Sequence, residues 1–481
     1  MQFDWATFAG RDLHLDLALK PGRRSSLEEA LREAIRSGRL VADTRLPSTR
    51  FLAADLGLAR GTVTDAYDQL AAEGWLVARQ GSGTRVASAP IPTETSPDRP
   101  TASPPQVETG RCHDFRPGRG DLSSFPRREW LAALRRALRE ADDAAFDYSD
   151  PRGLRVLRDA LSAYLGRARG LPVDPDLVVV CNGWVQGFGL IAEALRDSGA
   201  SRVAIEDPSM ARNPATLRRF GLAIVTVPVD RQGADPGALE SRGSAPAMLL
   251  TPAHQYPTGA TLSSDRRAAW IGWARDHDSV LIEDDYDGEF RYDRQPVGAL
   301  AALDPGRVIY AGTTSKTLAP GLRLGWLVLP RRWLDPVADL RPIVDRHTSA
   351  LDQLAMAEMI TSGAFDRHVR HARTRYRRRR DLLLTLLADQ VPVVKPHGIA
   401  AGLHTVIDLP VDGPTEDEVI DHLARSDVAV HGLASYLHRN GAGTPPALVV
   451  GFATPPEHAF AIAARALASS LADLYRGSAL H

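Results

Sequence analysis

The sequence predicts a multidomain protein in which a small α+β winged helix-turn-helix domain is followed by a large α/β domain. Three observations lead to this prediction. Residues 25–86 hold three short segments with helical spacing of apolar side chains and then two strand-like segments around a glycine-rich turn. Residues 88–110 are rich in Pro, Ser and Thr and poor in apolar residues, which is typical of a linker. From residue 177 onward, strand-like runs alternate with helical segments, which indicates a mostly parallel sheet covered by helices.

The composition limits the kinds of protein this can be. A chain of 481 residues can form two or three domains. Its net charge of -1 means that any contact with nucleic acid must come from a local surface. Two cysteines and 14 scattered histidines form neither a disulfide framework nor a metal-ligand pattern, so we expect no metal and a cytoplasmic location. No run approaches the ~20 apolar residues of a membrane helix, so we expect no membrane partner.

The first domain, residues 11–87, is predicted to contain three helices and a hairpin. The first helix covers Ser25–Ser37, Ser48 can cap the second, and the third runs from about Arg60 to Glu73. In a winged helix-turn-helix the third helix enters the major groove, and a glycine-rich wing lets the backbone approach phosphates. Because residues 11–87 hold 12 basic and 10 acidic residues, charge alone is weak support, and a helical protein–protein module is the alternative.

Seven strands are predicted in the large domain, residues 111–481. They are Leu177–Cys181, Arg202–Ile205, Ala223–Val229, Ala247–Leu250, Val280–Ile282, Val308–Tyr310 and Leu324–Leu329. In open α/β sheets, ligands bind at the carboxyl ends of the parallel strands. Glu283–Tyr286 follows the fifth predicted strand and Gly312–Lys316 follows the sixth, so we expect a site built from these two segments.

Lys316 is an unusual residue in this chain. Only three of the 58 Lys and Arg residues are lysines, namely Lys20, Lys316 and Lys395. A lysine amine can lose its proton and form a Schiff base with a carbonyl, which a guanidinium cannot do. Asp284 follows a buried strand, where a carboxylate needs a cation such as a protonated pyridine nitrogen. Together these residues predict pyridoxal phosphate bound through a Schiff base to Lys316.

Other side chains suit the rest of that cofactor. Tyr286 can donate a hydrogen bond to the phenolate oxygen of the pyridine ring. Thr313, Ser315 and Arg323 can bind the phosphate. Asn182–Gly187 opens a helix, and amides at a helix N-terminus bind phosphate. Each residue alone has a plainer interpretation as a cap or a turn, and it is their spacing as a set that favours a site.

These motifs resemble those of fold-type I aminotransferases. They are the Asp-x-Tyr pair at 284 and 286, the Thr-x-x-Lys at 313 and 316, and the arginine seven residues beyond the lysine. More narrowly, EDDYDGEF, HQYPTG and GTTSKTLAPGLRLGW resemble the MocR family of bacterial regulators. LPSTR, LARGTVTDAYDQLAAEGWL and RQGSGTRV resemble GntR-type DNA-binding domains. The resemblance covers nearly the whole chain.

The resemblance implies a fold-type I PLP-dependent transferase fold in a homodimer. Its large part would cover about 150–335, and a smaller C-terminal α/β part would cover about 336–481 plus 111–149. It implies cofactor contacts from Gly183, Trp184 and Val185 at the phosphate, from His254 beside the ring, and from Tyr148 to the neighbouring subunit's phosphate. Arg212 would bind a carboxylate of the effector. The implied DNA contacts are Arg50, Arg60, Thr62, Thr64, Gly81 and Gly83.

The chain departs from the aminotransferase pattern in three places. Tyr256 stands where an asparagine usually faces the cofactor, and Met210 stands where related regulators have an aromatic residue. Ala447–Phe452 lacks the arginine that binds the α-carboxylate of a substrate, and Arg439 lies out of pattern. We therefore do not expect ordinary transamination of α-amino acids.

Two hypotheses about function follow. The first is a transcription regulator that binds a double-stranded DNA operator and senses pyridoxal phosphate, or an amine or amino-acid effector, through its aminotransferase-like domain. The second is a working PLP-dependent aminotransferase with a DNA-binding appendage. The winged helix favours the first, and a substrate carboxylate site would favour the second.

One further segment is strongly basic. Residues 333–388 are predicted to form one or two long helices that include the run Arg373–Arg380. Basic runs usually form solvated helix faces. Contact with DNA is the less favoured interpretation of this run.

Overall fold

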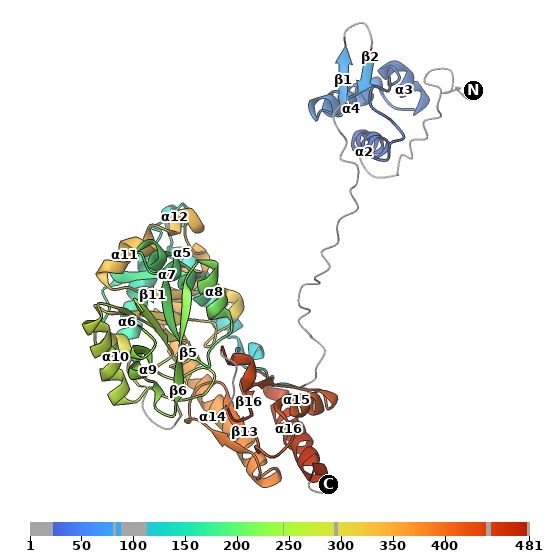
Figure 1. The fold of residues 1–481 in the computed structure, drawn as a ribbon. Coiled ribbons are helices and arrows are strands. Elements are labelled where there is room, and N and C mark those ends of the chain that lie inside the picture. Colours follow the sequence, from blue (N-terminus) through green and yellow to red (C-terminus); the bar gives the residue numbers. More distant parts are fainter. Residues whose placement is uncertain are drawn as a thin grey trace. The chain divides into compact units, whose positions relative to one another are not determined.

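The computed structural model describes residues 23–79, 83–87, 113–243, 245–292, 297–438 and 444–478 (Figure 1). The chain divides into two compact units, residues 1–107 and 108–481, which are described separately. The expected linker at 88–110, the wing residue Gly81 and Arg439 lie outside the described residues. Among the helices that are described, none is long and apolar enough to cross a membrane.

The small unit has the predicted winged helix-turn-helix fold. Its elements are α2 (Arg23–Arg36), α3 (Thr49–Asp55), α4 (Arg60–Ala72), β1 (Leu76–Arg79) and β2 (Gly83–Val86). The two strands pair antiparallel. Ser48 caps α3 by accepting a hydrogen bond from the amide of Phe51 at 3.2 Å. Leu27, Leu31, Val63 and Leu70 are fully buried where the helices meet.

The large unit is built on an eight-stranded mixed sheet. The strands are β4 (Val178–Cys181), β5 (Arg202–Asp207), β6 (Ala223–Asp230), β7 (Gly233–Ala234), β8 (Ala247–Leu250), β9 (Val280–Asp285), β10 (Val308–Thr313) and β11 (Gly325–Val328). Their order is β4-β11-β10-β9-β8-β5-β6-β7. All seven predicted strands are present, and the short edge strand β7 is additional. β11 runs antiparallel to both β10 and β4, so its first residue lies at the edge where β9 and β10 end.

Helices cover both faces of this sheet, and the strand residues alternate between two apolar layers. Val178 and Val180 of β4 pack in one layer, and Val179 and Cys181 pack in the other. The first layer includes residues of α6 (Arg155–Arg169), α10 (Ser264–Asp276) and α13 (Ala350–Thr361), with α5 (Arg127–Glu140) beside α13. The second includes residues of α7 (Trp184–Asp197), α8 (Arg212–Arg219) and α11 (Arg331–Ala338). Two short helices, α9 (Pro236–Glu240) and α12 (Arg341–Val344), complete this region.

A smaller part with its own core follows along the chain. Its sheet has the order β12-β13-β16-β15, with β12 (Lys395–His397), β13 (Thr405–Asp408), β15 (His431–Gly432) and β16 (Ala447–Val450). The helices α14 (Ala364–Gln390), α15 (Glu416–Arg425) and α16 (Glu457–Ser478) pack with it. The short strand β3 (His113–Asp114) pairs with β14 (Val428–Ala429), which ties the start of the large unit to this part.

Two expectations about this region need correction. Residues 331–390 form four helices, α11 to α14, of which only α14 is long; apolar side chains of α11 and α13 pack on the larger part. The two cores divide within α14: Phe365 and Val369 belong to the larger core, whereas Ala372 and Tyr376 belong to the smaller one. Phe125, Trp130 and Ala133 and the helix α13 also pack with the larger core, where we had expected 111–149 and 336–481 in the smaller part.

Candidate functional site

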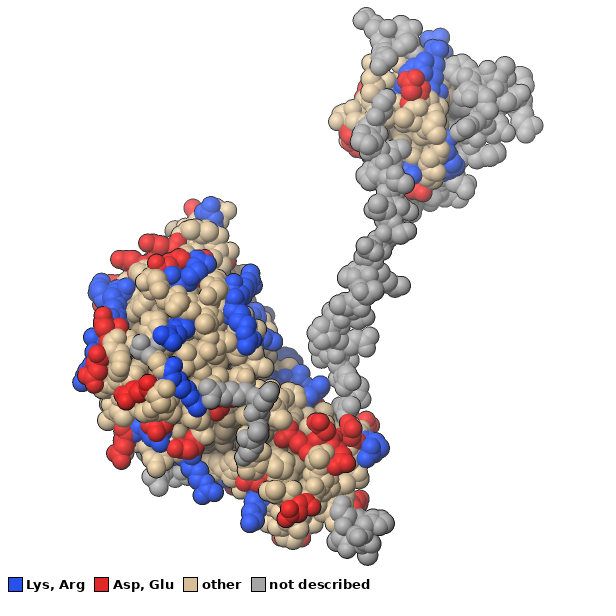
Figure 2. All heavy atoms as spheres, viewed as in Figure 1, with Lys and Arg blue, Asp and Glu red and all other residues tan. Residues whose placement is uncertain are grey.

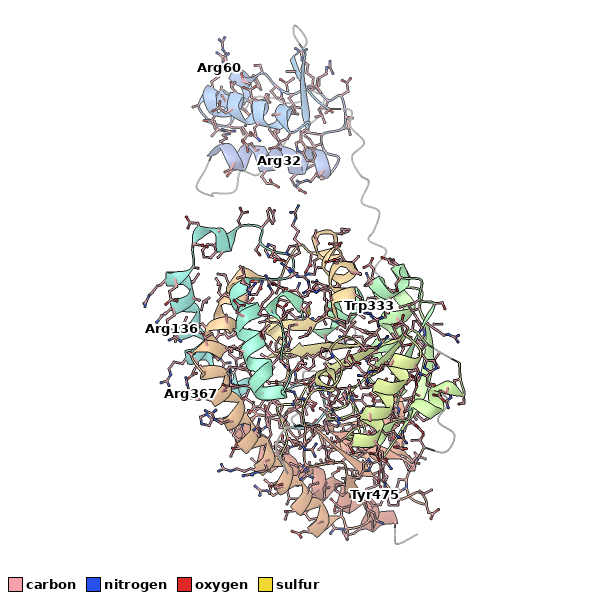
Figure 3. All side chains as sticks on the ribbon, turned by 90° about the vertical axis from the view of Figure 1, so that its left-hand side faces the viewer. Arg32, Arg60, Arg136, Trp333, Arg367 and Tyr475 are labelled. Atoms are coloured by element: carbon pink, nitrogen blue, oxygen red, sulfur yellow. The ribbon has the colours of Figure 1, made fainter. Side chains whose placement is uncertain are left out.

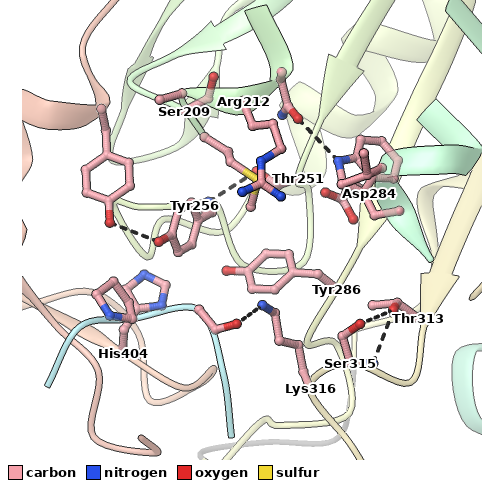
Figure 4. Close-up of a pocket in the computed structure, with 18 of the residues that line it drawn as sticks. Ser209, Arg212, Thr251, Tyr256, Asp284, Tyr286, Thr313, Ser315, Lys316 and His404 are labelled. Atoms are coloured by element: carbon pink, nitrogen blue, oxygen red, sulfur yellow. Dashed lines mark hydrogen bonds between the residues drawn. The ribbon is translucent and has the colours of Figure 1, made fainter. Parts of the chain in front are cut away.

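A cavity of about 800 Å³ opens at the carboxyl edge of the sheet (Figure 4). One wall comes from the ends of β9 and β10, the loop before β11 and the start of α7. The opposite wall comes from the smaller part, through Leu403, His404, His431 and Tyr436. In Figure 4, Lys316, Tyr286 and Asp284 point toward one shared space.

Lys316 lies in the loop that joins β10 to β11. Its amine donates a hydrogen bond to the carbonyl oxygen of Gly118. Burial lowers the pKa of the Lys316 amine, while the negative charges of Asp284 and Asp287 act in the opposite direction. The amine is thus easier to deprotonate than that of an exposed lysine, which a nucleophilic amine requires.

Asp284 and its neighbour Asp285 lie on opposite faces of β9 and have different surroundings. Asp285 is paired with Arg169 at 2.6 Å and accepts a hydrogen bond from Tyr310 at 2.7 Å, so its role is structural. Asp284 faces the cavity, is 7% exposed, and has no hydrogen-bond donor among the described residues. Burial raises its pKa to about 8, although the Lys316 charge favours the carboxylate. A buried acid without a donor is suited to receive a cationic group of a ligand.

Backbone and hydroxyl donors form a cradle on one side of the cavity. Gly183 precedes α7 with φ 77°, and a Cβ there would lie 3.1 Å from the guanidinium of Arg323. Arg323 has φ 49° and donates to the carbonyl oxygen of Asn182 at 2.6 Å. The Thr313 and Ser315 hydroxyls lie 2.9 Å apart. Trp184 and Val185 begin the helix and line the cavity together with Thr313, Ser315 and Arg323, and Gly183 directly precedes them.

Gln186 stabilises the turn that carries these donors. Its side-chain oxygen accepts hydrogen bonds from the Asn182 amide and the Arg341 guanidinium, both at 2.6 Å. Its side-chain amide donates to Asp345 at 2.5 Å. The turn before α7 is therefore also fixed by hydrogen bonds to residues distant in the sequence, Arg341 and Asp345.

Tyr286 contacts the buried pair His254 and Asp287. We had expected His254 beside the cofactor ring. The imidazole Nδ1 of His254 lies 3.1 Å from the Tyr286 hydroxyl and 2.9 Å from an Asp287 carboxylate oxygen. Tyr286 in turn donates to the His254 carbonyl oxygen at 3.0 Å. His254 does not line the cavity, so it lies behind Tyr286 rather than beside a bound ring. His404 lines the cavity instead, and its segment had no motif that could have indicated it.

The wall from the smaller part carries hydroxyl groups and apolar side chains. The hydroxyls of Tyr256 and Tyr436 lie 3.0 Å apart, and His431 Nδ1 is 2.7 Å from the Tyr436 hydroxyl. Val449 occupies the position where the aminotransferase pattern has an arginine, and it is fully buried against these tyrosines. Met210 packs on the same cluster.

Arg212 and Tyr148 differ in their relation to the cavity. Arg212 starts α8, is exposed, lines the cavity and has no carboxylate within 4 Å among the described residues. Tyr148 is 74% exposed and lies away from the cavity, with the Arg346 guanidinium 4.4 Å from its ring centre.

The predicted DNA-binding residues of the small unit are on its surface. Arg50 and Arg60 are exposed, and Arg60 is the first residue of α4. Thr62 and Thr64 are half-buried, and the Thr64 hydroxyl donates to the Arg60 carbonyl oxygen at 3.0 Å. Gly83 is exposed at the start of β2 with φ 85°, and the tip of the wing before it is not described.

Each of the two units matches a known protein family. Residues 118–436 match the family "Aminotransferase class I and II", and residues 23–86 match "Bacterial regulatory proteins, gntR family". The chain is 34% identical over 455 residues to the HTH-type pyridoxine biosynthesis transcriptional regulator PdxR of Corynebacterium glutamicum, covering 92% of this chain and 95% of that protein. It is 35% identical over 387 residues to the probable rhizopine catabolism regulatory protein MocR of Rhizobium meliloti, covering 76% and 78%.

Solved structures show the same relation for the large unit. A kynurenine aminotransferase of Pyrococcus horikoshii, in complex with PMP, superposes with a TM-score of 0.68 at 25% identity, covering 76% of this chain and 92% of that chain. The α-aminoadipate aminotransferase LysN of Thermus thermophilus, complexed with a phosphopyridoxyl-leucine, gives 0.67 at 26% identity, covering 76% and 92%.

Proposed function

The chain belongs to the family of GntR-type HTH transcriptional regulators that carry an aminotransferase class I and II domain, and we propose that it binds pyridoxal phosphate in the 800 Å³ cavity and senses a small molecule there. That it is a DNA-binding regulator follows from the family. The cofactor at this site and the sensing are the proposal. Because such a regulator acts on DNA, we place it in the bacterial cytoplasm.

The residues of the cavity fit pyridoxal phosphate. The observation that carries the proposal is the buried Asp284 carboxyl, which has no donor among the described residues and would receive the protonated ring nitrogen. Arg323, Thr313 and Ser315 would hold the phosphate together with the amides at the start of α7. Lys316 would hold the aldehyde carbon, and Tyr286 would hydrogen-bond the ring oxygen.

Each residue has a task that its surroundings support. Pyridoxal phosphate, when bound, supplies an aldehyde that condenses with amines and a ring that withdraws electrons. Lys316 can release its proton because burial lowers the pKa of its amine. Asp287 and His254 orient the Tyr286 hydroxyl from behind. Arg212 lies free at the mouth of the cavity and would bind an anionic end of an effector.

The alternative function, a working aminotransferase, has less support. The buried Val449 leaves no cation at the place where the pattern has the α-carboxylate arginine, within the described residues. We also propose a homodimer, in which the exposed ring of Tyr148 contributes to the neighbouring cofactor site.

Lys316→Ala tests the cofactor site. Wild-type protein titrated with pyridoxal phosphate should gain a visible absorbance band and, after borohydride reduction, a mass increase on the peptide that contains Lys316. Lys316→Ala should lose both, whereas Lys395→Ala, at an exposed lysine, should keep both. A band and mass increase that survive in Lys316→Ala would refute the assignment.

A second measurement separates sensing from catalysis. DNA that co-purifies with the protein can be sequenced to give the operator, and its affinity is then compared with and without pyridoxal phosphate and a panel of amines. A regulator that senses through this site should show a ligand-dependent change that Lys316→Ala abolishes. Sustained production of 2-oxo acids from the amines would instead favour the aminotransferase.

A further inference from the structure

Helix α14 carries a concentration of positive charge that is unusual for this chain. Its 27 residues include eight arginines and three aspartates, a difference of +5, whereas the whole chain has a net charge of -1. On the face of the large unit in Figure 2, basic and acidic side chains are interspersed. The excess on α14 is therefore a local feature, of the kind that a nearly neutral protein needs in order to bind a polyanion.

Two arginines of α14 that point inward, Arg373 and Arg379, have structural partners. Arg379 is buried and pairs with Asp121 at 2.7 Å and with Glu457 at 2.7 Å. Arg373 donates to the carbonyl oxygen of Glu289 at 2.8 Å. The expectation that the run 373–380 is simply a solvated face is thus wrong for these residues, which join α14 to its neighbours.

The exposed face of α14 carries arginines that form no salt bridge among the described residues. Arg367, Arg370, Arg377 and Arg378 are exposed, and the spacing of 3, 7 and 1 residues between them places all four on one side of the helix. None of the four has a carboxylate within 4 Å among the described residues. His371 and Thr374 are exposed between them, and Figure 3 shows Arg367 at the edge of the large unit. We call these four arginines the α14 stripe.

The α14 stripe has the dimensions of a phosphate-backbone contact. Arg367 and Arg378 are 11 residues apart, which is roughly 16 Å along a helix. Duplex DNA has one phosphate charge per about 1.7 Å of its axis, so a segment of that length offers several phosphates to four guanidinium groups. Guanidinium groups bind phosphate oxygens in forked pairs. Like charges spaced at helical turns repel each other, and a polyanion would remove that repulsion.

We propose that the α14 stripe binds the phosphate backbone of double-stranded DNA. This contact would be independent of sequence and would add to the contact made by the winged helix. DNA is the polyanion that this regulator already binds. A linear, uncompensated row of arginines with no aromatic side chain between the exposed positions fits a backbone contact rather than stacking on single-stranded bases. The stripe would raise affinity for any duplex and leave the reading of sequence to α4.

Salt dependence of DNA binding tests this proposal in the full-length protein. The probe is a fluorescent 40-base-pair duplex of random sequence, and anisotropy gives Kd from 50 to 200 mM KCl. Each lost phosphate contact should reduce the slope of log Kd against log salt by about 0.9. The variant Arg370→Gln, Arg377→Gln, Arg378→Gln should therefore have a slope lower by about 2 to 3 than wild type, with weaker binding at 50 mM.

A matched variant controls for net charge. Arg218→Gln, Arg219→Gln, Arg231→Gln removes the same three charges from exposed arginines elsewhere on the large unit and should leave the slope unchanged. Equal slopes for the two triple variants, or no change in either, would overturn the proposal. If the α14 triple variant loses its helical circular dichroism, the single variants Arg370→Gln and Arg378→Gln should each show a loss of about 0.9.

The outcome is separable from the role of the winged helix. The double variant Arg50→Ala, Arg60→Ala should have a weaker preference for the operator over random duplex. Adding the α14 triple substitution to that double variant should still lower the salt slope by about 2 to 3. In the α14 triple variant that preference should remain within about twofold of wild type. A triple variant that loses operator preference but keeps its salt slope would contradict the assignment of the stripe to the backbone.

Discussion

Replacing Asp284 by asparagine removes one buried titrating group and changes little else. The two side chains have nearly the same shape, and Asp284 has no hydrogen-bond donor among the described residues that the change would orphan. Burial raises the pKa of the Asp284 carboxyl from 3.8 to about 8 in the folded protein without cofactor. The folded chain therefore holds a proton on Asp284 at pH values where the unfolded chain has already released it.

The sign and size of the effect follow from this difference in proton binding. Between pH 3.8 and about 8 the unfolded state binds fewer protons at this position, so the free energy of unfolding falls as the pH rises. Each pH unit within that window costs about 1.4 kcal/mol, which gives about 4 kcal/mol between pH 5 and pH 8. Asparagine does not titrate, so its own burial cost is the same at both pH values.

The assay is urea unfolding of the cofactor-free protein, followed by tryptophan fluorescence, at pH 5 and pH 8. From pH 5 to pH 8, the free energy of unfolding of the wild type should fall by about 4 kcal/mol more than that of Asp284→Asn. The exposed acid Asp276, changed to asparagine, serves as a control that should behave like wild type. Saturating pyridoxal phosphate should make the pH dependence of the wild type more like that of Asp284→Asn, because a protonated ring nitrogen would keep Asp284 ionised. Parallel pH profiles for wild type and Asp284→Asn without cofactor would refute the reasoning.

Three further changes test separate parts of the structure. Arg60→Ala should weaken operator binding by about 5- to 150-fold, which is the roughly 1 to 3 kcal/mol of a groove contact, without changing the affinity for pyridoxal phosphate, and anisotropy and absorbance titrations check both. Gly183→Ala should weaken pyridoxal phosphate binding by about tenfold, because a Cβ at φ 77° is strained and would displace Arg323, and the absorbance titration checks this. Arg379→Leu should lower the stability of the large unit by about 3 to 5 kcal/mol, since Asp121 would be left buried without its cation, and urea unfolding measures the loss.

The parts of the fold that were predicted are those determined by local pattern. Ser48 as a cap, the glycine-bounded helix at Arg60 and the seven apolar strands each depend on residues that are adjacent in sequence. The antiparallel direction of β11 could not be read in this way, because apolar periodicity carries no direction. The position of α13 depended on contacts with α5 and α6, more than 180 residues earlier in the chain.

The candidate site shows the same division. Lys316, Asp284 and Arg323 were predicted because their chemistry and spacing are distinctive, and they meet in one cavity. His404 and Tyr436 come from the smaller part and carried no local motif, so only the tertiary structure brings them to the opposite wall. His254 was expected beside the cofactor ring, whereas it is paired with Asp287 and is not among the residues that line the cavity; nothing in its sequence context indicated that buried pair.

Helix α14 is shared by the two cores of the large unit, because Val369 is packed in one and Ala372 in the other. The cavity is also shared, because Lys316 and Asp284 come from the larger part and His404 and Tyr436 from the smaller. Tilting one core against the other to close that cavity would therefore bend α14 between Val369 and Ala372, in the first third of the helix. Arg367 and Arg370 lie at the start of the helix and Arg377 and Arg378 follow the bend, so such a movement would change the spacing of the α14 stripe and, if the stripe binds DNA as proposed, would link occupation of the cavity to that contact.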